Sequence, residues 1–304
     1  MSRSWPGPWA ALIFCGGLLP LGQAQQLILT DGTVTSFREI KRVDNNLVLT
    51  VEVGGGRGEF PMPLSRVARL EMPQNPAGPE MERRLQEGLA SSVVTDVTPL
   101  LNQYAPFKDI PGNPWPAMAL IKIKALLALH RSAEAEELIV QINRAATDEV
   151  TKQFLRVYEG SLLIHHKKFA EAAAAADEIL RSKPASPVAA AAFLMKGDAL
   201  LGLGKFEPAL LTYLRIVVYH SSEHALLPAA LWGSAQAYEG LGDQTHSLAS
   251  WKELVSDYPT SWQAAQAKAL IAKADLSAPP NETASSPETK TPQNKAPAQP
   301  PSSP

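Results

Sequence analysis

The spacing of hydrophobic residues changes once along the chain. Between Gln25 and Met72 apolar and polar residues alternate, as in the run of Leu47, Leu49 and Val51, which is the period of β-strands. Asp31-Gly32 is a sequence typical of a hairpin turn. We therefore expect about five short strands over residues 25–72, closing into a small barrel-like or strongly bent sheet.

Beyond this segment the apolar residues recur every three to four positions, the period of amphipathic helices. The change follows the proline-punctuated stretch 73–79, and Pro79 suits the first position of a helix. The predicted fold class is therefore mainly α. A small all-β, barrel-like domain over 25–72 and a linker over 73–79 precede a helical domain over 80–275.

The helical segment repeats itself. Residues Gly197 to Val217 predict two amphipathic helices separated by a short break at Leu203-Gly204-Lys205. The same order of small, aromatic and aliphatic residues returns every 37 or 38 residues. The repeated small positions on first helices are Gly160, Gly197 and Ala235, and the matching second-helix positions are Ala172, Ala209 and Ser247, then Ala176, Tyr213 and Trp251.

This pattern resembles the tetratricopeptide repeat, a helix-turn-helix unit of about 34 residues that stacks into an α-solenoid. The slightly longer spacing is similar to that of exported bacterial envelope members of the family. The resemblance implies units near 116–146, 150–184, 187–221 and 226–259, with a capping helix over 261–274. Each unit exposes an apolar surface that it buries only against its neighbours.

In the tetratricopeptide family the first helices line a concave groove that binds an extended peptide or a helix of a partner protein. Trp232 is the largest side chain that the resemblance places there. It is either an anchor for a ligand or covered by a neighbouring helix. Aligning the repeats selects the following groove residues: Lys124, Leu127, Phe154, Ser161, His165, Leu194, Asp198, Leu201, Trp232, Gln236 and Glu239.

The two ends of the chain differ from the rest. Arg3, the apolar run from Ala10 to Leu21 and the small residues before Gln25 predict a secretory signal over 1–24, cleaved after Ala24. Cys15, the only cysteine, lies inside it, so the mature chain has no disulfide. Residues 276–304 are rich in proline and contain no aromatic residue, which predicts a disordered tail. We expect an exported protein, periplasmic or associated with the cell envelope.

Net charge and one short motif bear on which classes of function fit the sequence. The formal net charge is −2 with acidic and basic residues interspersed, which argues against a nucleic-acid partner and against tight membrane association after signal removal. His220-Ser221-Ser222-Glu223-His224 matches the HxxEH pattern of a class of zinc proteases. Zinc would need both histidines on one face of a helix, whereas the repeat alignment places this pentapeptide in a turn.

We therefore predict a protein that is not an enzyme and uses no cofactor or metal. The preferred function is a scaffold or adaptor that binds another, unidentified protein in the groove of the repeats. The alternative is a structural accessory of envelope assembly that acts through the β domain or the tail. A metal-dependent hydrolase at His220 and His224 is the remote alternative.

Overall fold

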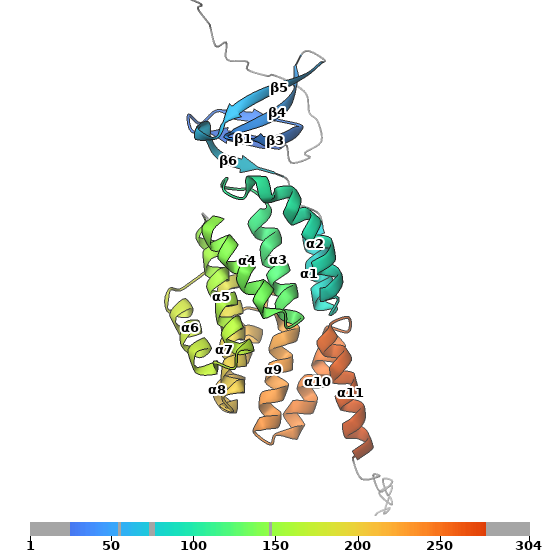
Figure 1. The fold of residues 1–304 in the computed structure, drawn as a ribbon. Coiled ribbons are helices and arrows are strands. Elements are labelled where there is room, and N and C mark those ends of the chain that lie inside the picture. The colour runs from blue at the N-terminus through green and yellow to red at the C-terminus, as the bar shows by residue number, and fades with distance from the viewer. Residues whose placement is uncertain (1–24, 54–55, 73–76, 146–147, 278–304) are drawn as a thin grey trace, which may run out of the picture.

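The computed structural model describes residues 25–53, 56–72, 77–145 and 148–277. Over these residues the chain is mainly helical, with eleven α-helices and a small N-terminal sheet region (Figure 1). The predicted order of a strand segment followed by a long helical segment is confirmed at this level. The predicted signal peptide, and the predicted tail from residue 278 onward, lie outside the described residues.

The N-terminal strands form two separate sheets. The strands are β1 (Gln26–Leu29), β2 (Val34–Ser36), β3 (Glu39–Val43), β4 (Asn46–Val53), β5 (Gly56–Pro63) and β6 (Val67–Glu71). Strands β2-β1-β6 make one three-stranded antiparallel sheet, and β3-β4-β5 make the other. The predicted hairpin turn is present between β1 and β2, where Gly32 has a φ of 82° and the Thr33 amide donates to Asp31 at 2.9 Å.

The prediction of a barrel-like domain was wrong, because the two sheets do not close on each other. Strand β5 is an edge strand and carries Pro61 and Pro63. Proline has no amide hydrogen, so the free edge of β5 lacks donors that a further paired strand would need. The alternation of apolar residues indicates strands, but it does not indicate which strands pair.

The sheets share one hydrophobic core with a segment of the helical region. Leu27 and Leu70 from the first sheet and Leu47 from the second are fully buried there, together with Phe107 and Ile110, which follow α2 in the chain. The Leu70 amide donates to the Pro111 carbonyl at 2.8 Å, and Arg42 donates to the Pro106 carbonyl at 2.7 Å and to Asp109. Segment 105–113 therefore joins the sheets to the helices.

The helices follow in pairs. Their bounds are α1 (Ala77–Gln86), α2 (Ala90–Tyr104), α3 (Trp115–Ala128), α4 (Ser132–Ala145), α5 (Glu149–His165), α6 (Phe169–Arg181), α7 (Ser186–Gly202), α8 (Phe206–Tyr219), α9 (Leu227–Gly240), α10 (Gln244–Asp257) and α11 (Trp262–Ser277). Each odd-numbered helix from α3 onward also packs against the next odd-numbered helix. The odd-numbered helices therefore form a continuous row.

The turn inside each pair from α3 to α10 has one repeated geometry. Its central residue is left-handed, and this residue is His130, Lys167, Gly204 or Gly242. In each turn the amide of this residue donates to the carbonyl three positions earlier, and the next amide donates to the carbonyl five positions before it, at 2.8–3.0 Å. This is the Schellman helix ending. The local backbone therefore repeats with the period of the hydrophobic pattern.

Large side chains of one pair fit against glycines of the next. The Tyr213 ring on α8 lies between Gly197 on α7 and Gly233 on α9, where an added Cβ would come within 2.5 Å and 2.3 Å of the ring. Phe206, the first residue of α8, covers Gly240 near the end of α9 in the same manner. These glycines allow the close approach of helices that lets the aromatic rings fill the space between pairs.

The row of helices bends back toward its start. Trp262, the first residue of α11, packs on Gly88 in the turn between α1 and α2, where an added Cβ would be 3.0 Å from the Trp262 Cβ. In Figure 1 the beginning of α11 accordingly lies next to the lower end of α1. The contact joins the first and last described helices, which are far apart in sequence.

Candidate partner-binding face

The eleven groove residues selected from the sequence lie on four successive odd-numbered helices. Lys124 and Leu127 are on α3, and the rest are distributed over α5, α7 and α9. Because these helices pack side by side, their exposed positions form one surface. We call this surface the first-helix face, defined by Lys124, Asp198, Leu201, Gln236 and Glu239, which are exposed or half-buried.

Asp198 is the most perturbed acid on this face. Its carboxylate accepts a hydrogen bond of 2.7 Å from the hydroxyl of Tyr213. Burial among surrounding helices raises the pKa of Asp198 to about 6, although the Tyr213 hydrogen bond acts in the opposite direction. The residue still keeps an exposed surface. The neighbouring helices therefore desolvate the carboxyl group in part, while water still reaches the residue.

A second polar cluster on this face consists of Lys124 on α3, Glu82 on α1 and Tyr158 on α5. The Lys124 ammonium contacts the Glu82 carboxylate of α1 at 2.5 Å. Burial alone would lower the pKa of Lys124, but the Tyr158 hydroxyl and the Glu82 carboxylate together raise it. Lys124 is therefore a charged and already paired group at neutral pH. Glu82 and Tyr158 were not found from the sequence, since Glu82 lies outside the repeats and Tyr158 resembles an ordinary core residue.

Trp232 packs inside a cluster of three tryptophans. Its ring centre lies 4.6 Å from that of Trp251 and 5.9 Å from that of Trp262. Trp251 is 3% exposed, and Trp232 itself is half-buried. Of the two interpretations made from the sequence, this arrangement favours coverage by neighbouring helices over a free ligand anchor.

Four other selected residues make contacts that occupy their side chains. Leu127 is buried in the core of the first helices. Phe154 stacks beside Tyr158, and the Ser161 hydroxyl donates to the Val157 carbonyl at 3.0 Å. His165 meets the edge of the His130 ring, and burial lowers its pKa, so it is neutral at pH 7.

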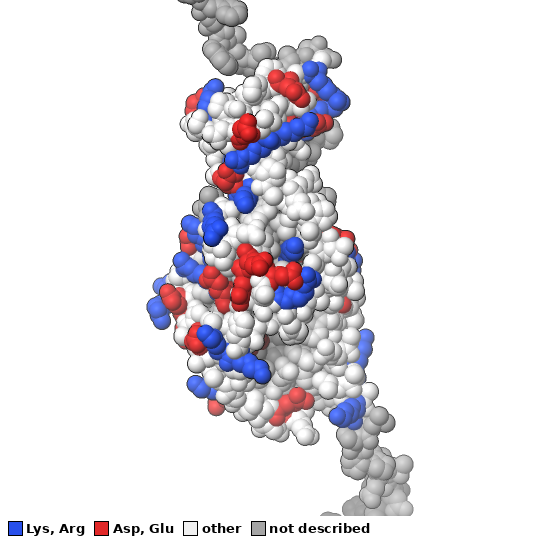
Figure 2. Space-filling view, viewed as in Figure 1, with Lys and Arg blue, Asp and Glu red and all other residues white. Residues whose placement is uncertain are grey.

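Charge is unevenly distributed over the molecule. In the view of Figure 2 acidic and basic side chains gather over α3 to α5, whereas the lower part of the helical region is mostly uncharged. The sequence agrees with this view: Glu239 is the only charged residue of α9, and α7 carries only Lys196 and Asp198.

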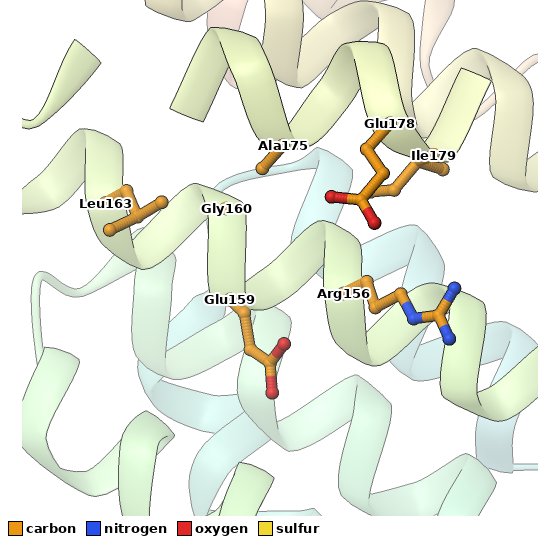
Figure 3. Close-up of a pocket in the computed structure, with 7 residues that line it drawn as sticks. All are labelled: Arg156, Glu159, Gly160, Leu163, Ala175, Glu178 and Ile179. Carbon is orange, nitrogen blue, oxygen red and sulfur yellow. The ribbon is translucent and has the colours of Figure 1, made fainter. Parts of the chain in front are cut away.

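A separate hollow of about 330 Å³ opens between α5 and α6 (Figure 3). Arg156 and Glu178 extend toward it from the two helices. Gly160 also lines the hollow, and the place of its missing side chain is taken by Met195 of α7. Glu159 at its edge accepts a hydrogen bond of 3.0 Å from Asn143. The hollow combines one basic and two acidic side chains, without a nucleophile beside a base.

The HxxEH pentapeptide does not lie on a helix. Helix α8 ends at Tyr219 and α9 begins at Leu227, so His220 and His224 are in the turn between them. The Nδ1 atom of His220 is 2.9 Å from the Ser186 hydroxyl. Within the described residues no group of three or more histidine, cysteine or acidic side chains could hold a metal ion.

Comparison of the chain with models of protein families, with curated proteins and with solved structures found no match. Over the described ranges, none of the helices is long and apolar enough to cross a membrane.

Proposed function

We propose that this protein is a non-enzymatic scaffold of helical repeats, similar to tetratricopeptide solenoids, that binds a segment of another protein across the first-helix face. The repeated turn geometry of α3 to α10 and the continuous row of odd-numbered helices carry this proposal. Such a row offers a long surface with equivalent positions at regular intervals, which suits an extended peptide or a helix.

The composition of the face indicates the kind of segment. Leu201 supplies apolar contact area, whereas Asp198, Gln236 and Glu239 supply hydrogen-bond acceptors. Lys124 is already neutralised by Glu82. A mixed segment with apolar side chains and one or two basic residues therefore complements the face better than an acidic peptide does.

We further propose that the protein acts after export, in the cell envelope. This rests on the signal-like residues 1–24 of the sequence. Intact-mass analysis of protein recovered from the source cells tests it. The mature chain should begin at Gln25, and a chain that retains Met1 to Ala24 would contradict export by this signal.

The binding proposal is tested by photo-crosslinking and pull-down from the envelope fraction of the source cells. The variant Gln236→Arg/Glu239→Arg places two cations on the face, at side chains that are half-buried and exposed. The control Glu137→Arg/Gln141→Arg makes the same two substitutions at exposed positions of α4, away from the face.

We expect the first variant to lose the crosslinked partners and the control to keep them, with both retaining the helical circular dichroism of the wild type. If both variants keep every partner, the first-helix face is not the binding surface. Binding through the sheet region would then be the better explanation.

A further inference from the structure

The last described helix leaves an apolar surface beside it. A hollow of about 390 Å³ lies between α10 and α11 and is open to solvent. Its apolar part is supplied by Val255, Ile271 and Ala272, and a lysine stands on each helix at its rim. The lining residues are Lys252, Val255, Ser256, Lys268, Ile271 and Ala272.

The repeat explains why this surface is open. Val217 on α8 is the residue 38 positions before Val255, and it packs against the core cluster formed by Leu231, Trp251 and Leu254 of the next pair. Val255 has no such pair beyond it within the described residues, because α11 is not followed there by a second helix. The hollow therefore occupies the place of a helix that would pair with α11.

The C-terminal segment 277–304 is a poor occupant. It contains eight prolines and no leucine, isoleucine, valine, methionine or aromatic residue. It has neither the helix propensity nor the apolar side chains to fill the surface. A second copy of the chain, related by a two-fold axis through the hollow, would bring Lys252 and Lys268 against the same two lysines, and like charges in contact oppose association.

The charges of the rim favour a different occupant. Lys252 and Lys268 are exposed, and within the described part of the chain neither makes an ion pair or a hydrogen bond. One is on α10 and the other on α11, so each of the two helices contributes a cation to the hollow. A helix with an apolar stripe flanked by acidic residues satisfies both the floor and the rim.

We propose that the α10–α11 hollow is a docking site for an acidic amphipathic helix of a partner protein, which completes the row by pairing with α11. This site is distinct from the first-helix face. It lies at the C-terminal end of the row of helices. It binds an acidic helix, whereas the first-helix face prefers a segment with basic residues.

A pair of synthetic peptides tests the site. Both are amphipathic helices of roughly four to five turns with the same apolar stripe, flanked by glutamates in one and by lysines in the other. Binding to the full chain is measured by fluorescence anisotropy of the labelled peptides. We expect the glutamate peptide to bind about tenfold more tightly than the lysine peptide, because each rim contact changes from attraction to repulsion.

The variant Lys252→Glu/Lys268→Glu should reverse this preference, so that the lysine peptide becomes the tighter ligand. The control Lys168→Glu/Lys205→Glu changes the same charges at exposed positions directly before α6 and α8, and it should leave the preference unchanged. All four sites are on the surface, so circular dichroism should report an unchanged fold.

Three results would overturn the inference. The first is equal binding of the two peptides, and the second is a preference that the Lys252→Glu/Lys268→Glu variant does not alter. The third is concentration-dependent self-association in sedimentation experiments that the glutamate peptide competes away, which would make a second copy the occupant. In the second case, if Gln236→Arg/Glu239→Arg does change the affinity for the glutamate peptide, the peptide lies on the first-helix face, and only the α10–α11 site is rejected.

Discussion

The helical region and the sheet region are stabilised by contacts of different range. In the helices each turn is closed by backbone hydrogen bonds within five residues, and the rings that fill the spaces belong to adjacent pairs. In the sheet region the core is completed by Phe107 and Ile110, which arrive only after two helices have intervened. Apart from the contact of Trp262 with Gly88, the helical region is built from local, repeated contacts, whereas the sheet region is attached through a single junction.

This difference determines how a local change should spread. In a row of repeated pairs, stability is approximately the sum of each pair and its contacts with its neighbours. Damage in one pair is therefore shared by the pairs on either side. The sheets have no repeated neighbour, and their attachment depends on segment 105–113 and its bonds to Leu70 and Arg42.

The largest expected effect is in the helices, at Gly233. The variant Gly233→Ala places a Cβ 2.3 Å from the Tyr213 ring, and that ring is blocked on its other side by Gly197. The helices must separate, which we expect to lower the free energy of unfolding by about 3 kcal/mol. Urea unfolding followed by circular dichroism measures this change.

Tyr213→Leu supplies the control for that experiment, because a smaller side chain gives the new Cβ room. The double variant Gly233→Ala/Tyr213→Leu should be less destabilised than the sum of the single variants. Additive effects would mean that contact between Gly233 and Tyr213 does not limit how closely α8 and α9 approach.

A smaller effect is expected at the junction of the two regions. Gly112 has a φ of 81°, and a Cβ there would be 2.4 Å from the Leu70 carbonyl oxygen. Gly112→Ala therefore combines a strained backbone with a clash against β6, at a cost of about 2 kcal/mol. Hydrogen exchange should rise in β1 and β6 and stay unchanged in α7 to α10.

Gly32→Ala is matched to this variant, since Gly32 has a φ of 82° but nothing within 4 Å of an added Cβ. It reports the backbone strain alone, so it should be the milder change. If Gly32→Ala and Gly112→Ala destabilise the sheets equally, the close approach of segment 105–113 to β6 contributes little to holding the regions together.

The comparison also explains which parts of the fold could be predicted from the sequence. Small residues such as Gly197 and aromatic residues such as Tyr213 each have counterparts 37 or 38 residues away in the chain. These repeated positions reflect contacts between adjacent helix pairs. These contacts can be predicted from the sequence because helix pairs that touch in space are consecutive along the chain. The strands separate into two sheets that pack on the distant residues Phe107 and Ile110, and hydrophobic alternation contains no information on which strands pair.

The candidate site also contains contacts that the repeat pattern does not encode. Alignment of the repeats predicted Lys124 and Asp198 as groove residues, by carrying over positions from the resemblance to tetratricopeptide repeats. It could not reveal that Glu82 neutralises Lys124 or that Trp232 packs between two other tryptophans, since these contacts involve the non-repeating α1 and α11. Side chains at the ends of the row therefore require the structure.

The smallest expected effect concerns the pH dependence of stability, through Asp198. In the folded protein its pKa is about 6, whereas in the unfolded chain it should lie near the usual 3.8. Between these pH values the folded state binds more protons than the unfolded state, so the free energy of unfolding contributed by Asp198 falls as pH rises. The loss is complete above about pH 6 and absent below about pH 4.

Asp198→Asn removes this dependence, because the amide does not titrate while its oxygen still accepts the Tyr213 hydrogen bond. We expect the variant to be more stable than the wild type at pH 7 by roughly 1 kcal/mol, which is less than the full pKa shift implies, since solvent reaches the exposed part of the side chain. Thermal melts at pH 4 and pH 7 measure the difference. Glu239→Gln, an exposed change on the same face, should keep the wild-type pH profile. An Asp198→Asn variant that also keeps that profile would show that the carboxyl is solvated as in the unfolded chain, and that the packing of α7, α8 and α9 does not raise its pKa.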